Sequence, residues 1–192
     1  MKKKILVDFD STTANSPKAI FEIYKEETND NGAIYHNDYL WNFEGLLPKE
    51  YSERAIELFG EDKFFDRLEL MPNAYEVLEE LNKRYDVAIC SVHNIKTAHK
   101  KESFIRKNLP FIKEIILIGY DGKFDKSSIE GNIIIDDKVS CLFGIREKKI
   151  LFGDYAYNQL VNTKGDEKNI LLYDPYVVRA ENWNRVRPLL LK

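Results

Sequence analysis

Long apolar runs are missing from this sequence. None of its apolar segments approaches the roughly 20 residues that a helix needs to cross a bilayer, so we expect no membrane partner. Charge of one sign is missing too, because 29 Lys and Arg face 32 Asp and Glu and the formal net charge is −3. Without a broad basic face, a nucleic-acid polymer is not an expected partner. A small anionic ligand, bound by a local cluster of side chains, is compatible with this balance.

Cysteine is scarce as well. The two thiols, Cys90 and Cys141, lie within apolar stretches, as buried thiols usually do, so we expect neither a disulfide nor a thiolate zinc site. The charged start MKKK is similar to that of a signal peptide. Asp8 and Asp10, however, interrupt the apolar region that a signal peptide needs. We therefore expect a cytoplasmic protein.

What the sequence does contain is a series of short apolar runs that alternate with helical patterns. The runs read as strands buried on both faces: residues 4–10, 86–91, 114–119, 132–137 and 149–154. Between the runs at 4–10 and 86–91, Val77, Leu78 and Leu81 show helical spacing. They follow Pro72, which we expect in the first turn of that helix. This alternation predicts an α/β fold, with a three-layer, Rossmann-like, doubly wound parallel sheet.

Residues 16–70 break the alternation. The pair Ser16-Pro17 is typical of an N-cap and first helical turn, and a second helical stretch covers residues 49–59. No strand-like run is obvious in this segment. We therefore expect a small helical cap at residues 16–70, inserted after the first strand into a catalytic core made of residues 1–15 and 71–192.

Polar side chains follow four of the five predicted strands. In chain order they are Asp8 and Asp10, Ser91, Lys126, and the pair Asp136 and Asp137. Because ligands of parallel sheets bind beyond the carboxyl ends of the strands, we expect these side chains to converge on one edge. Singly, each has an ordinary explanation as a helix cap, a turn residue or a solvated lysine. Together, carboxylate pairs after very apolar strands favour a divalent cation, and an all-oxygen ligand set suits Mg²⁺.

This set of residues resembles the motifs of the haloacid dehalogenase superfamily. The matching positions are the DxDxT motif at Asp8, Asp10 and Thr12, the strand-terminal Ser91, Lys126, and the acidic pair Asp136 and Asp137. The blocks FFDRLELMPNAYEVLEELN, DKSSIEGNIIIDDK and ENW at 181–183 are similar to the 5'(3')-deoxyribonucleotidase-like branch. The resemblance implies a phosphoric monoester hydrolase that acts on a small phosphate monoester, with a (deoxy)nucleoside monophosphate as the leading substrate.

The resemblance also implies roles for these residues. Asp8 would attack phosphorus to form an aspartyl phosphate, and Asp10 would act as general acid and then general base. Mg²⁺ would be held by Asp8, the backbone carbonyl of Asp10, and Asp136 and Asp137. The phosphoryl group would be bound by Ser91 and Lys126.

A charge count calls for one more cation. The three metal-binding carboxylates and a phosphate monoester of roughly −2 outweigh Mg²⁺ and Lys126 by about two charges. Lys101 matches a phosphate-facing lysine of the nucleotidase branch by its place in KKESFI. The alternative, that Lys101 is one of several solvated lysines on a helix at 96–109, is equally compatible with the sequence.

The chain departs from the branch mainly where the base is read. Ser11 replaces a glycine, Ser16 replaces an aromatic residue that stacks on the base, Val92-His93 replaces Ser-Pro, and GYDGKF at 119–124 replaces a shorter link. A lone histidine such as His93 is usually structural. A stacking surface for a base is offered instead by Tyr39, Trp41 and Phe43, and the alternative is that these aromatics form the core of the cap.

Two other functions are compatible with the motifs. An aspartyl phosphate can be intercepted by an acceptor other than water, which gives phosphotransfer. A phosphate-binding or signalling domain of the receiver type also combines an acidic pair, a phosphorylated Asp, a hydroxyl and a lysine. In receivers the acidic pair comes first in the chain and there is no equivalent of Asp10. The presence of Asp10 therefore favours turnover of the aspartyl phosphate over its storage as a long-lived phosphoprotein.

Overall fold

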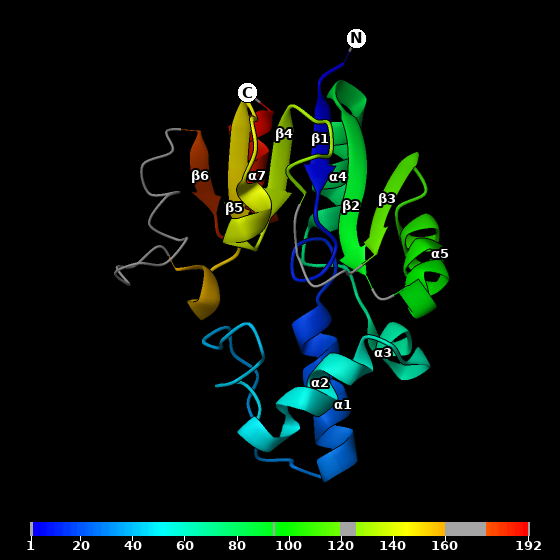
Figure 1. The fold of residues 1–192 in the computed structure, drawn as a ribbon, viewed down its shortest axis with the longest axis vertical. Helices are drawn as coiled ribbons and strands as arrows, with labels where there is room; N and C mark the ends of the chain where they lie inside the picture. Colours follow the sequence, from blue (N-terminus) through cyan, green and yellow to red (C-terminus); the bar gives the residue numbers. More distant parts are fainter. Residues whose placement is uncertain (1, 94, 120–125, 160–175, 192) are drawn as a thin grey trace.

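A six-stranded parallel sheet forms the centre of the protein (Figure 1). The computed structural model describes residues 2–93, 95–119, 126–159 and 176–191. Its strand order is β3-β2-β1-β4-β5-β6, and each neighbouring pair is parallel. The strands are β1 (Lys4–Val7), β2 (Asp86–His93), β3 (Glu114–Gly119), β4 (Ile133–Asp136), β5 (Lys148–Phe152) and β6 (Val177–Ala180). The predicted fold class is confirmed, and the first five strands lie where the apolar runs placed them.

The sixth strand, β6, is absent from the sequence-based prediction. It lies at the edge of the sheet beside β5, and its first three residues, Val177, Val178 and Arg179, are only partly buried. An edge strand covered on one side needs no continuous apolar run, and a charged residue in its middle is tolerated. The pattern that identified the buried strands therefore could not identify β6.

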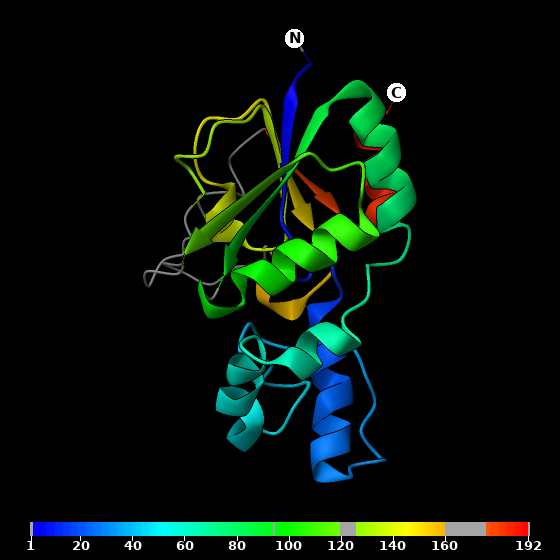
Figure 2. The ribbon, with the colours of Figure 1, turned by 90° about the vertical axis from the view of Figure 1, so that its right-hand side faces the viewer.

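Both faces of the sheet are covered. Helices α4 (Ala74–Arg84), α5 (Ala98–Asn108) and α7 (Trp183–Leu190) pack against one face, as Figure 2 shows from the side. Ile5 and Val7 of β1 join the core under these helices, whereas Leu6 faces the opposite side, with the 3-10 helix η3 (Val139–Leu142). This double burial explains why the strands are continuously apolar. Among the residues that the structure describes, no helix combines the length and apolarity needed to cross a bilayer.

Two helix starts differ from the prediction. Pro72 lies outside α4, because the N-cap is Asn73 in a left-handed conformation with φ 63°. In α1 (Ser16–Thr28) the N-cap is Asn15, whose side chain accepts a hydrogen bond from a backbone N–H of the first turn. The expectation that Ser16 caps this helix is therefore wrong. Its hydroxyl is left to bind another partner, described below.

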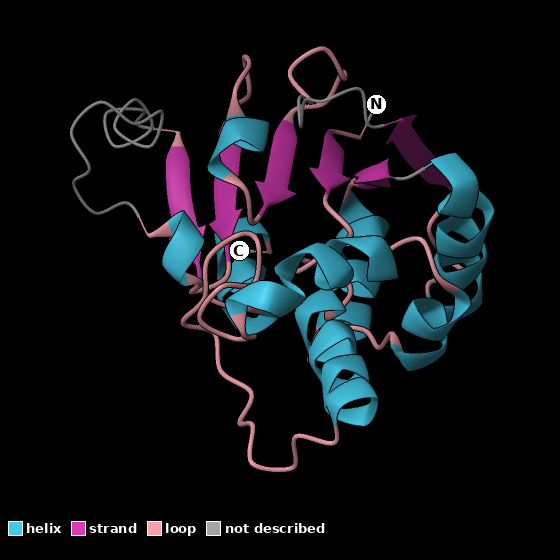
Figure 3. Cartoon of the chain, turned by 60° about the horizontal axis from the view of Figure 1, so that its bottom comes forward, coloured by secondary structure: helices cyan, strands magenta, loops and turns pink. Residues whose placement is uncertain are grey.

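The segment between β1 and α4 is helical and lies beyond the carboxyl ends of the strands. It contains α1, the 3-10 helix η1 (Lys49–Tyr51), α2 (Ser52–Leu58) and α3 (Asp62–Arg67), and Figure 3 shows these helices grouped past the arrowheads of the sheet. The two connections to the core run side by side, since Ala14 forms an antiparallel bridge with Leu70. Backbone hydrogen bonds of 2.9 and 2.8 Å flank that bridge. On the basis of this pairing, we propose that the helical segment is a cap bounded by residues 16 and 70.

Candidate active site

Asp8, the first residue after β1, is the centre of the site. Its N–H donates to the carbonyl of Ile135 at 2.9 Å, which continues the β1–β4 pairing by one residue. Since β4 ends in Asp136, the two carboxylates meet at one edge of the sheet. Lys126 Nζ donates to both of them, to Asp8 Oδ1 and to Asp136 Oδ2 at 2.7 Å. All three side chains are buried.

Asp137 completes a buried acidic cluster. One carboxylate oxygen from each of Asp8, Asp136 and Asp137 lies within 4.8 Å of the others. Asp137 also accepts hydrogen bonds from Thr12 Oγ1, at 3.3 Å, and from the hydroxyl of Tyr157. Ligands on opposite sides of Mg²⁺ lie about 4 Å apart, because each metal–oxygen distance is about 2.0–2.1 Å. The spacing and the all-oxygen chemistry of this cluster therefore fit a metal site.

Burial and mutual repulsion perturb the titration of this cluster. Burial, together with the charges of Asp136 and Asp10, raises the pKa of Asp8 to about 7, although Lys126 opposes the shift. Burial and the charges of Asp8 and Asp136 raise the pKa of Asp137 well above its usual range. For Lys126, burial alone lowers the pKa, but the attraction of Asp136 and Asp8 outweighs it and the net shift is upward. A bound cation would relieve the repulsion among these carboxylates.

A second group of polar side chains surrounds Asp10. Lys101 Nζ donates to Asp10 Oδ2 at 2.5 Å and to Ser91 Oγ at 2.9 Å. Lys101 is only 5% exposed, so the alternative of a solvated lysine on α5 is wrong. Ser16 Oγ, at the start of α1, donates to Asp10 Oδ1 at 2.7 Å. Asp10 is therefore held from two sides, by the first helix after β1 and by α5.

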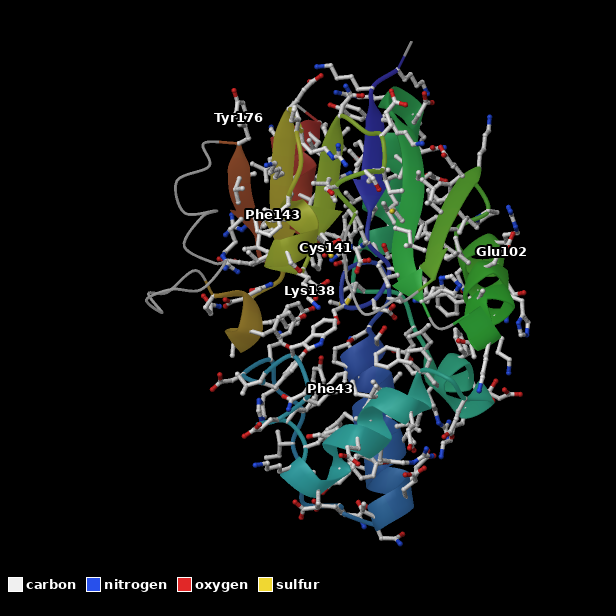
Figure 4. The ribbon with its side chains drawn as sticks, in the orientation of Figure 1. Phe43, Glu102, Lys138, Cys141, Phe143 and Tyr176 are labelled. Atoms are coloured by element: carbon white, nitrogen blue, oxygen red, sulfur yellow. The ribbon has the colours of Figure 1, made fainter. Side chains whose placement is uncertain are left out.

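The acidic cluster and Lys126 meet Asp10 at a cavity of about 40 Å³, whereas Ser91 and Lys101 lie outside its lining. Its lining is Asp8, Asp10, Trp41, Val92, Lys126, Asp136, Asp137, Lys138 and Cys141. Figure 4 places Lys138 and Cys141 between the ends of the strands and the helical segment. The volume suits an ion with a few waters, but it is far below the roughly 300 Å³ of a typical small-molecule pocket.

The three aromatic residues at 39, 41 and 43 do not share one environment. Trp41 lines the cavity, and Lys138 Nζ lies 3.9 Å from the centroid of its ring. Tyr157, which binds Asp137, meets Trp41 edge-on with a centroid distance of 5.8 Å. Tyr39 and Phe43 are buried in the core and stack on one another at 6.1 Å, outside the cavity lining. Of the three, Trp41 is placed to meet a ligand.

Other positions singled out in the sequence have clear local environments. His93 ends β2 with a buried side chain, outside the cavity lining, and its Nδ1 has no hydrogen-bond partner among the described residues. Ser11 has φ 58°, a left-handed conformation that glycine adopts at no steric cost. Cys90 and Cys141 are buried thiols, as expected. Most of the link GYDGKF, residues 120–124, lies outside the described residues.

Sequence reasoning missed several side chains that hold the site together. Tyr157 binds the Asp137 carboxylate, and Asn158 Nδ2 donates to the Asp137 carbonyl at 3.1 Å. Trp183 Nε1 donates to the carbonyl of Thr12 at 2.8 Å. Trp183 belongs to the ENW block, so a signal for it existed. Nothing in the sequence pattern pointed to Tyr157 or Asn158.

Comparison with known proteins agrees with this geometry. The family model described as "5' nucleotidase, deoxy (pyrimidine), cytosolic type C protein" matches residues 2–192. A 5'(3')-deoxyribonucleotidase from Clostridium acetobutylicum is 27% identical over 149 residues, which cover 78% of this chain and 73% of that protein.

Two solved structures share the fold. A haloacid dehalogenase-like hydrolase from Streptococcus pneumoniae gives a TM-score of 0.55 at 18% identity, over 98% of this chain and 97% of that one. A hydrolase of the same superfamily from Geobacter sulfurreducens gives 0.54 at 12% identity, over 98% and 96% of the two chains. At these identities the likeness establishes the fold alone.

Proposed function

The chain belongs to the cytosolic type C 5' nucleotidase family of haloacid dehalogenase-type phosphatases, and on that basis we propose that it is a 5'(3')-deoxyribonucleotidase. As a member it is a phosphoric monoester hydrolase, and its substrates are small phosphate monoesters. Membership favours hydrolysis over the storage of phosphate. The observation that carries the proposal is the meeting of Asp8, Asp10 and Lys126 at one cavity beside an acidic cluster.

The acidic cluster supports Mg²⁺ as cofactor. In this proposal Asp8, Asp136 and Asp137 hold the ion through carboxylate oxygens, and Asp10 contributes its backbone carbonyl. When all groups are ionised, the four carboxylates of the site face the two ammonium groups of Lys126 and Lys101, and one divalent cation balances the remaining charge. When bound, Mg²⁺ supplies Lewis-acid stabilisation of charge on the phosphoryl oxygens.

Asp8 acts as the nucleophile in the proposed reaction. Lys126 binds its Oδ1, and no hydrogen-bond donor among the described residues binds Oδ2. Oδ2 forms a bond to phosphorus while the ester bond breaks and leaves its electron pair on the departing oxygen, which takes a proton from Asp10. Asp10 then removes a proton from the water that attacks phosphorus, and the bond between Asp8 and phosphorus breaks.

Ser91 and Lys101 bind the phosphoryl oxygens in this scheme, together with Lys126. Lys101 Nζ already lies between Ser91 and Asp10. An incoming phosphoryl group would therefore compete with Asp10 for an ammonium that is in place. Because this ammonium is buried, its hydrogen bonds to an anion are stronger than those of a solvated lysine.

Recognition of the nucleoside is assigned to the cap at residues 16–70. Trp41 would stack on the base, whereas Tyr39 and Phe43 are buried in the core. The cavity of about 40 Å³ does not accommodate a nucleotide. We therefore propose that the cap moves away from the sheet to admit the substrate and excludes water from the reaction when it returns.

A substrate panel tests this function. Purified protein with Mg²⁺ is assayed on deoxynucleoside 5'- and 3'-monophosphates, the matching ribonucleotides, and non-nucleotide phosphate monoesters. Higher kcat/KM for the deoxynucleotides supports the nucleotidase assignment, and equal kcat/KM across the panel removes it while leaving a phosphatase. An added alcohol acceptor separates phosphotransfer from hydrolysis through the products formed.

A pair of variants tests the nucleophile in the same assay. Asp8→Asn is expected to lower kcat by at least about 10³-fold, because loss of a nucleophile removes the covalent route. Asp86→Asn, at the exposed start of β2, is the matched control and is expected to retain activity. Full activity in Asp8→Asn overturns the assignment of Asp8.

A further inference from the structure

A buried arginine is attached to the turn that begins at Lys126. Arg146 precedes β5 and is 9% exposed. Its Nη2 donates to the carbonyl of Lys126 at 3.1 Å and also to the carbonyl of Ile129. The N–H of Ile129 donates to the same Lys126 carbonyl at 3.1 Å. The guanidinium therefore binds both ends of one turn, residues 126–129.

A second contact holds the same turn. Gly144 has φ +100°, and a Cβ at this position would lie 3.3 Å from both the Cα and the carbonyl oxygen of Ser127. A left-handed conformation and a close backbone approach both favour glycine. The loop at residues 144–146 thus fits the turn at residues 126–129 by shape as well as by hydrogen bonds.

Lys126 joins this turn to the acidic cluster, because its backbone belongs to the turn and its side chain reaches the carboxylates. Lys126 Nζ binds Asp8 and Asp136 at once. A lysine side chain has a flexible four-carbon stem, so its reach to two fixed carboxylates depends on the position of its backbone. Arg146 donates to the backbone of Lys126 and does not line the cavity itself.

We propose that Arg146 is a positioning residue, which holds the Lys126 backbone so that the ammonium group lies between Asp8 and Asp136 and can bind a phosphoryl oxygen. This inference rests on the proposed role of Lys126 in phosphate binding. Arg146 makes no contact with the substrate in this arrangement. Its effect on binding passes through Lys126, and a displacement of about 1 Å in an active site can cost about 100-fold.

A double-mutant cycle on the full chain tests the inference. The affinity for inorganic phosphate is measured by calorimetry with saturating Mg²⁺ for the wild type, Arg146→Met, Lys126→Met and the double variant. Each single change is expected to weaken phosphate binding on the order of 10-fold. Arg146→Met is expected to have no further effect once Lys126 is replaced, because the group that it positions is then missing.

Three further variants separate positioning from general stability. Arg146→Lys keeps the charge, but its side chain is one atom too short to place a donor where Nη2 binds the carbonyls of Lys126 and Ile129, so it is expected to weaken phosphate binding too. Gly144→Ala disturbs the same turn without removing a charge and is expected to depend on Lys126 in the same way. If Arg146→Met does not fold, Gly144→Ala takes its place in the double-mutant cycle with Lys126→Met. Val77→Ala, buried in α4, lowers the Tm, and its effect on phosphate affinity is expected to be the same with and without Lys126.

The outcomes distinguish this inference from the function on which it rests. If Arg146→Met weakens phosphate binding equally in the wild type and in Lys126→Met, Arg146 does not act through Lys126. Unchanged phosphate affinity in Arg146→Lys and Gly144→Ala overturns the inference as well. If Lys126→Met binds phosphate normally, the proposed role of Lys126 fails, and the positioning role of Arg146 fails with it.

Discussion

Lys101 Nζ lies 2.5 Å from Asp10 Oδ2, so an ammonium group on α5 is paired with the carboxylate proposed as general acid and base. The same ammonium lies 2.9 Å from Ser91 Oγ, a candidate phosphate ligand. Substrate binding would thus exchange one partner of Lys101 for another. In the proposed reaction, Lys101 would connect the binding of phosphate with the environment of Asp10.

Replacement of Lys101 tests this connection. Lys101→Met is expected to lower kcat/KM on the order of 100-fold, because it removes a buried donor to the phosphoryl group. Lys107→Met, an exposed lysine on the same helix, is the matched control and is expected to keep wild-type kinetics. Steady-state kinetics with a saturating level of Mg²⁺ provide the measurement. Equal kinetics for the two variants would show that Lys101 has no part in binding or turnover.

Removal of one hydroxyl tests the support of the metal site. Tyr157→Phe loses the hydrogen bond to Asp137 but keeps the ring, which stacks on Tyr155 at 5.2 Å. We expect Mg²⁺ affinity to fall about 10-fold, as is typical when a partner of a metal ligand is lost. Calorimetric titration with Mg²⁺ measures it, and Tyr75→Phe on the exposed surface of α4 is the control. Unchanged Mg²⁺ affinity in Tyr157→Phe would show that the Tyr157 hydroxyl does not support the metal site.

The pH dependence of stability follows from the raised pKa of Asp8. This pKa is about 7 in the folded chain against 3.8 for the ordinary group, so the folded state holds a proton that the unfolded state has lost between these values. That contribution to stability is fully present below the unfolded pKa and disappears as pH rises through the folded pKa. In EDTA, the Tm advantage of the wild type over Asp8→Asn is therefore expected to shrink from pH 4 to pH 8.

Mg²⁺ is expected to reverse this trend, because it competes with protons for the same carboxylates. The rise in wild-type Tm on adding Mg²⁺ should be larger at pH 8 than at pH 6. Scanning calorimetry of both proteins at each pH provides the measurement. If, in EDTA, the Tm difference between wild type and Asp8→Asn stays constant from pH 4 to pH 8, the pKa of Asp8 is not raised.

The backbone at Ser11 predicts a difference between two substitutions. Ser11 has φ 58°, which glycine adopts freely and β-branched residues avoid. Ser11→Val is expected to lower the free energy of unfolding by about 1–3 kcal/mol, whereas Ser11→Gly should change it by less than about 1 kcal/mol. Urea unfolding measures both, with Ser103→Val at an exposed position of α5 as the control. Equal stability of Ser11→Val and Ser11→Gly would show that the left-handed conformation is not required.

The sheet and its polar edge could be predicted because their physical requirements are local. A strand buried on both faces needs a continuous apolar run such as Ile133 to Ile135, and parallel strands present their carboxyl ends at one edge. The start of α1 was predicted one residue late, because Asn15 and Ser16 are both good N-caps and only the fold gives Ser16 another partner, Asp10.

Contacts between distant segments could not be predicted in the same way. The helix at 98–108 carries several basic residues, and only its packing against the sheet decides that Lys101 faces Ser91. Tyr157 lies in a short 3-10 helix (Ala156–Asn158) and Arg146 in the loop before β5, and neither segment has a periodic apolar pattern. Their roles depend on the way separate crossovers of the chain meet, which a single sequence does not encode in a local pattern.

The bridge between Ala14 and Leu70 has a mechanical consequence. Because the chain leaves and re-enters the core at adjacent points, the helical segment is connected to the sheet at a single place. This connection begins at Ala14, two residues after Thr12, which binds Asp137, and four after Asp10. If the helical segment moves to admit the substrate, as proposed above, the bridge links that movement directly to the loop that carries Asp10.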